Sequence, residues 1–274
     1  MASIAAVSVF GKLPQLPHSK ARTLSKLSYP NHPTEHGYLT ETIRQKYITA
    51  AITSQLLPKD AHRIPEILSL DASNDMKKPI QFWQLYSVLG QDHIVGIVGN
   101  FYQRVFANEA WFRSVFANVG GVNHHIGTQA SMWIDVMGGG PYYHGAEYRL
   151  SFHHTHNAHQ LMDEKGAKRW VKLMVEALED TRHLMTADPR VRPSLNTFLS
   201  HFFAKYATDF GFKNIETFGD INPPFRRKIN FMNMTTTAIE ALTEEELRSA
   251  LADRGLDLPK NHTKADLVQK ALNL

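Results

Sequence analysis

Two stretches of the chain decide its fold class: residues 92–106, DHIVGIVGNFYQRVF, and residues 163–178, DEKGAKRWVKLMVEAL. In both stretches the apolar side chains recur with a period of about 3.6 residues, which is typical of the buried face of an amphipathic α-helix. Asp92 and Asp163 stand just before these apolar runs, where a helix N-cap is expected. We therefore predict two core helices here, and no alternation of apolar and polar residues predicts a β-strand elsewhere.

The same periodicity predicts helices on both sides of these two. Pro58 and the run GGGP at residues 138–141 cannot continue a helix, so they mark helix ends. Residues 138–162 are expected to be mostly irregular, with a short helical stretch around residues 148–156. The further helices predicted on this basis span residues 40–57, 82–90, 125–137 and 195–210.

A pair of short helices is predicted at the C-terminal end of the chain. Thr243 and Glu246 have the spacing of a capping box, and Gly255 is a natural residue to follow the helix that they open. Thr263 is positioned to cap a second helix. We thus expect an all-α protein in five parts: an arm (1–34), a helical extension and linker (35–80), a main helical domain (81–212), a second linker (213–241) and a small helix–extended–helix module (242–274).

Composition excludes several classes of protein. The 274 residues include no cysteine, which excludes disulfides, cysteine-ligated metal sites and thiol catalysis. No apolar run reaches about 18 residues, so no transmembrane segment is predicted. The net charge of +4 equals the four Lys and Arg residues of the arm, which has no acidic residue before Glu35. The rest of the chain is balanced and is not expected to attract nucleic acid by charge.

The arm, residues 1–34, is rich in Ala, Ser, Lys and Arg and has no Asp or Glu. This composition is typical of an organellar transit peptide. We therefore expect a mitochondrial protein, with a plastid location as the alternative. If the arm is retained, it is a candidate for binding other subunits of an organellar complex.

Histidines concentrate in one region, since seven of the 15 lie between residues 124 and 159. Imidazole is the commonest side-chain metal ligand and also binds haem iron. The run HHTHNAH at residues 153–159 is compatible with a non-haem metal site, with one axial haem ligand, or with a solvated histidine-rich loop. The first is weakened because no carboxylate stands at a suitable spacing and no His-Glu-x-x-His motif is present.

Residues 82–210 resemble the truncated haemoglobins, and most closely their second group. The resemblance rests on the joint order and spacing of several short features rather than on one motif. In chain order these are Phe101-Tyr102, Phe116, Trp133-Ile134, Gly139-Gly140-Pro141 with Tyr143, and Trp170 followed by Val171-Lys172-Leu173-Met174.

This resemblance implies a truncated globin-like helical sandwich that binds haem b and, through it, O2 or NO. His156 lies 14 residues before Trp170, close to the family spacing, and is the predicted iron ligand; His154, 16 residues before Trp170, is second. Tyr102 and Trp170 would donate hydrogen bonds to the gas, with Gln129 as a further donor if its helix is shifted by one residue. The cofactor-binding residues implied are Phe101, Tyr102, Phe116, Ile126, Ala130, Trp133, His154 and Trp170.

The resemblance leaves the function open in two respects. No catalytic side chain is predicted, so any NO dioxygenase or peroxidase-like activity would be chemistry of the iron. The alternative function is a haem-free, globin-like structural subunit of a large mitochondrial or plastid complex.

The C-terminal module carries, in order, Leu242-Thr243, Glu246-Leu247, Leu251, Arg254-Gly255-Leu256, Thr263-Lys264-Ala265-Asp266-Leu267-Val268 and Leu272. With these residues, the stretch 242–274 resembles a SAP motif, a unit that often binds DNA. The module carries five Lys and Arg residues against six Asp and Glu residues. Because phosphate binding requires an excess of positive charge, we expect a protein-docking module and consider nucleic-acid binding unlikely.

Overall fold

The computed structural model describes residues 32–143, 152–213, 217–222 and 229–274. The predicted transit-like arm therefore lies almost wholly outside the described residues. Within them the chain is helical and contains no β-strand, apart from one isolated bridge between Glu35 and Gly139. The predicted all-α class is confirmed. None of the helices in the described ranges has the length and apolar content needed to cross a membrane.

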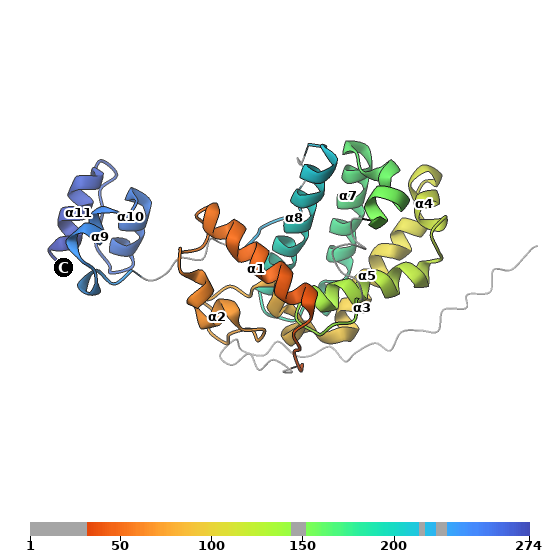
Figure 1. Cartoon of the computed structure of the whole chain (residues 1–274), viewed down its shortest axis with the longest axis horizontal. Coiled ribbons are helices and arrows are strands. Elements are labelled where there is room, and N and C mark those ends of the chain that lie inside the picture. Colours follow the sequence, from red (N-terminus) through yellow and green to blue (C-terminus); the bar gives the residue numbers. More distant parts are fainter. Residues whose placement is uncertain (1–31, 144–151, 214–216, 223–228) are drawn as a thin grey trace, which may run out of the picture.

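Figure 1 shows the helices of the main domain and, in blue, the short helices near the C-terminus. The main domain and its N-terminal extension contain α1 (Tyr38–Thr53), α2 (Pro65–Leu68), α3 (Leu85–Phe106), α4 (Ala110–Ala117), α5 (Val122–Val136), α7 (Glu164–Asp180) and α8 (Val191–Phe210). The C-terminal helices are α9 (Thr236–Glu240), α10 (Glu244–Ala252) and α11 (Lys264–Leu272).

Helix α3 is the centre of the main domain and packs against α4, α5, α7 and α8. Helix α7 begins as predicted, because the Asp163 carboxylate accepts a hydrogen bond from the Gly166 amide at 2.7 Å. Its buried face includes Leu173, Met174 and Leu178. These apolar faces form one continuous core that extends into α1 and α8.

Several helix ends differ from the predictions, for local reasons. The first two helices of the main domain form one element, α3, which is interrupted at Gly90 by a φ of 68°. The ring of His32 covers Gly90 so closely that a Cβ there would lie 2.5 Å from it. Helix α8 begins at Val191 rather than residue 195, since Pro193 is tolerated in a first turn that lacks hydrogen-bonded amides. Helices α2 and α4 were not predicted.

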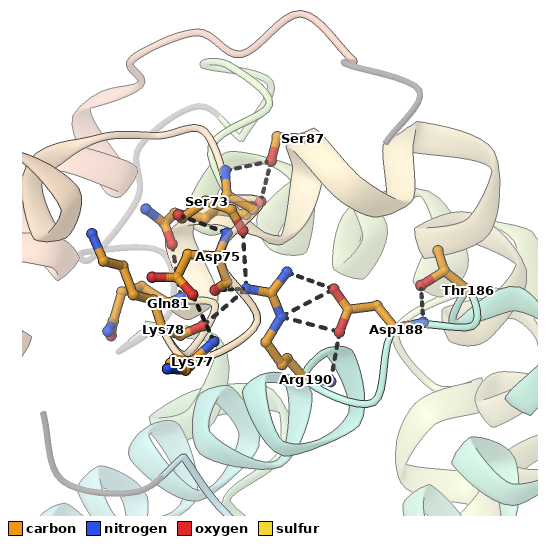
Figure 2. A network of polar contacts seen from close by, with 11 residues as sticks. Ser73, Asp75, Lys77, Lys78, Gln81, Ser87, Thr186, Asp188 and Arg190 are labelled. Carbon is orange, nitrogen blue, oxygen red and sulfur yellow. Dashed lines mark hydrogen bonds and ion pairs between the residues drawn. The ribbon is translucent and has the colours of Figure 1, made fainter. Parts of the chain in front are cut away.

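A buried ionic cluster fixes the linker that precedes α3 onto the start of α8 (Figure 2). The Arg190 guanidinium is paired with Asp188 at 2.8 Å, and both side chains are almost fully buried. The same guanidinium donates hydrogen bonds to the backbone carbonyls of Ser73, Asp75 and Lys78 at 2.8–2.9 Å. The extension is thereby tied to the main domain by charge-assisted hydrogen bonds.

The C-terminal helices have a hydrophobic core of their own. The capping box of Thr243 and Glu246 is present as predicted, and Thr263 caps α11 together with Asp266. The core also contains Phe231 and Ile239, which lie in the segment predicted as a linker. Helix α9, which lies in the predicted linker, therefore belongs to the core of the C-terminal module.

Candidate functional site

The main domain contains a partly open cavity of about 410 Å³. Its lining comes from α3, α4, α5, α7 and α8 and from the turn that precedes α7, and most of it is aromatic or aliphatic. Cavities of a few hundred Å³ with apolar walls and a few polar groups are typical small-molecule sites. The polar side chains in the lining include Tyr102, His125, Gln129, Tyr143, His154 and Tyr206.

The structure brings His154, and not His156, to the cavity. His154 lines it, and its ring stacks on that of Tyr206 with 4.2 Å between the centroids. His156 is exposed, stacks on Phe152, and has its Nδ1 atom 2.8 Å from the Thr155 hydroxyl. Both lie in a π-helical turn, His153–Asn157, where residues two apart point to nearly opposite sides. Of the two predicted iron ligands, His154 therefore lines the cavity and His156 does not.

Helix α5 turns a different set of side chains to the cavity than predicted. His125, Gln129, Met132 and Trp133 line it. Ile126 and Ala130 are not among the lining residues, and the Cδ1 atom of Ile126 lies over Gly99 of α3. This arrangement corresponds to the shifted alternative in which Gln129 becomes a cavity residue.

Two aromatic residues from the predicted set occupy successive layers of the wall. Trp170 reaches the cavity, whereas Phe101 is fully buried behind it, with the two rings 5.0 Å apart. Tyr102 and Phe116 line the cavity and pack edge to face. Of the nine predicted residues, the cavity brings together five, namely Tyr102, Phe116, Trp133, His154 and Trp170.

Burial favours the uncharged forms of two polar side chains in the cavity, Tyr102 and His125. The Tyr102 hydroxyl donates a hydrogen bond to the Gln129 side-chain oxygen at 3.3 Å, and burial raises the pKa of Tyr102 well above its usual value. Burial lowers the pKa of His125, whose Nε2 atom lies 2.8 Å from the Phe116 carbonyl oxygen. The cavity therefore presents neutral donors and acceptors in an apolar surround.

Comparison with known proteins agrees with this geometry. The family model for bacterial-like globins matches residues 84–203, which include α3 to α7 and much of α8. Residues 84–203 therefore resemble this family, and this matched part of the chain is called the globin domain below. The two-on-two hemoglobin-3 of Arabidopsis thaliana is 28% identical over 117 residues, which are 42% of this chain. The match spans 60% of the length of that relative.

Two residues that line the cavity, His125 and Tyr206, were not predicted as site residues from the sequence. His125 stacks on Tyr102, with ring centroids 5.3 Å apart, and Tyr206 stacks on His154. His125 is four residues before Gln129 and so lies on the same face of α5. The one-residue shift that brings Gln129 to the cavity would therefore have predicted His125 as well. Tyr206 carried no such signal, because it belongs to the continuous apolar stripe of α8.

The residues of the globin domain fit a haem group. Haem iron requires a neutral imidazole nitrogen, and the macrocycle requires apolar walls. His154 supplies the imidazole, and Phe116, Trp133, Trp170 and Phe198 supply part of the wall. Among the described residues, no group of three or more His, Asp or Glu is placed to hold a bare metal ion.

Proposed function

We propose that this chain binds haem in the cavity of its globin domain, with His154 as the axial ligand, and thereby binds a diatomic gas such as O2 or NO. The observation that carries the proposal is the position of the His154 imidazole in an otherwise largely apolar cavity of about 410 Å³. When bound, haem would supply the iron that takes up the gas.

The chain's own residues would set how tightly the gas is held. The protonated Tyr102 hydroxyl is a donor inside the cavity, and the Gln129 amide next to it is a second. A hydrogen bond from such a donor to a partly charged group contributes about 1.5–3 kcal/mol. The aromatic wall excludes water, which strengthens these bonds.

An absorption spectrum of the full-length protein titrated with haemin tests the proposal. We expect a Soret band that shifts or is lost in His154→Ala and is retained in His156→Ala. The second variant is a matched control, because His156 lies in the same turn but outside the cavity. Failure of the unmodified protein to bind haemin would overturn the proposal and favour the haem-free structural subunit.

We also propose that the arm, residues 1–34, directs the protein to mitochondria, with plastids as the alternative. Its excess of basic residues and lack of acidic ones support this. Fusion of residues 1–34 to a fluorescent protein is the test. Fluorescence confined to mitochondria is expected, and diffuse fluorescence would contradict the proposal.

A further inference from the structure

Residues 35–40, here named the N-terminal strap, run along the end of α5 and the turn that follows it. The Glu35 amide donates a hydrogen bond to the Gly138 carbonyl oxygen at 3.0 Å. Glu35 also forms the isolated bridge with Gly139. Although it belongs to the extension, the strap is therefore in backbone contact with the glycine-rich turn of the globin domain.

Asp135, near the end of α5, is the central contact of the strap. The Thr40 hydroxyl is hydrogen-bonded to the backbone carbonyl of Asp135 and lies 3.2 Å from its Oδ1 atom. Asp135 is completely buried, and Gly37 lies so close that a Cβ there would be 2.0 Å from Oδ1. Only a glycine at this position lets the strap approach the carboxylate.

The same contacts extend to Tyr143, which lines the cavity. Burial raises the pKa of the Asp135 carboxyl, and the Thr40 hydroxyl and the Tyr143 backbone amide, which lie near this carboxyl, oppose the rise. The Tyr38 hydroxyl donates a hydrogen bond to the Tyr143 carbonyl oxygen. The strap thus holds the Tyr143 carbonyl directly through Tyr38, and through Thr40 it holds Asp135, whose carboxyl lies near the Tyr143 amide.

We propose that Tyr38 and Thr40 are positioning residues for the ligand cavity, acting on Tyr143 from outside the globin domain. The inference rests on the proposed function, because it assigns these residues to the same cavity. Neither residue touches the cavity itself, since the lining includes Tyr143 but neither Tyr38 nor Thr40. The N-terminal extension would then be a working part of the ligand site and not only an attachment to it.

Thr40→Val tests this, because valine keeps the shape of threonine and removes the hydroxyl. We expect amide hydrogen exchange in residues 138–143 of the haem-free protein to rise about tenfold, the factor equivalent to about 1.4 kcal/mol for a lost buried hydrogen bond. Tyr38→Phe should have a similar effect, and haemin should dissociate several-fold faster from both variants. Thr40→Ser, which retains the hydroxyl, should restore both rates.

Thr53→Val is the matched control, since Thr53 is exposed on the same helix and bonds only within it. Unchanged amide exchange in both Thr40→Val and Tyr38→Phe would overturn the proposal. Faster exchange with unchanged haemin dissociation would equally overturn the assignment to the ligand site. If the unmodified protein takes up no haemin, the proposed function fails, while the exchange rates still decide whether the strap positions the wall.

Discussion

The Tyr102 hydroxyl is the donor on which we expect gas affinity to depend most. In Tyr102→Phe the cavity keeps its shape but loses this donor, so O2 should dissociate at least tenfold faster, in line with about 1.5–3 kcal/mol for the lost bond. Stopped-flow measurement of O2 release checks this. Tyr142→Phe is the control, because Tyr142 is exposed and outside the cavity. Equal rates in the two variants would remove the Tyr102 hydroxyl from gas binding.

The buried carboxyl of Asp135 predicts a pH dependence of stability. Burial raises the pKa of Asp135 to about 6 from its usual value of 3.8. Between these two values the native state binds more protons than the unfolded state, so the free energy of unfolding falls as the pH rises. Between pH 5 and pH 7 the free energy of unfolding of the unmodified protein should fall by about 1 kcal/mol relative to that of Asp135→Asn, as measured by urea unfolding. If the free energies of unfolding of the two proteins change equally between pH 5 and pH 7, the prediction is wrong.

The choice of histidine shows what the sequence could not supply at the scale of residues. Spacing to Trp170 favoured His156, which lies 14 residues before it, over His154, which lies 16 residues before it and would need a longer insertion. What separates the two is the direction in which each ring points from a π-helical turn, His153–Asn157. A π-helical turn contains one extra residue, which changes the side to which the following side chains point. The spacing of apolar residues in the sequence does not predict such a change. Tyr102 and Trp133, which lie on regular helices, both line the cavity.

At the scale of elements, the Arg190 cluster shown in Figure 2 predicts a large loss of stability when it is broken. Arg190→Met leaves the buried Asp188 carboxylate without its ion pair and frees three carbonyls of the linker. We expect a loss of about 3–5 kcal/mol in urea unfolding. Arg182→Met, which removes an exposed ion pair, should cost less than about 1 kcal/mol. Similar losses of stability in both variants would show that the buried Arg190 cluster contributes no more to stability than an exposed ion pair.

Short helices were predictable where they carry a capping box, as α10 and α11 do, whereas α2 and α4 were not predicted. Helices α3, α7 and α8 have many apolar residues at helical spacing, so the sequence predicts which face of each helix packs into the core. Helix α4 has eight residues, and α2 has four. Helices of this length are not stable alone, and their formation depends on packing such as that of Phe112 and Phe116 into the core. The one-residue phase difference in α5 has the same origin, since Ile126 packs toward Gly99 of α3.

At the scale of the whole molecule, the C-terminal module is a separate unit whose partner class can be argued from its arginines. The Arg248 guanidinium donates hydrogen bonds to the carbonyls of Pro259, Lys260 and His262 within the module. Arg254 is bonded to the Asn230 side chain and lies over the Phe231 ring. Both arginines therefore stabilise the module, and a phosphate backbone would have to displace these contacts.

We accordingly expect the full-length chain to show no binding to duplex DNA at physiological salt, as measured by fluorescence anisotropy. Weak binding at low salt should have a shallow salt dependence, because the slope reports how many phosphates are neutralised. A triple Lys260→Ala, Lys264→Ala and Lys270→Ala variant serves as the control and should behave like the unmodified protein. Strong binding that depends steeply on salt and is lost in this variant would show that the module's lysines contact phosphates. Its acidic residues, which now favour docking to a protein, would then have to lie on another face.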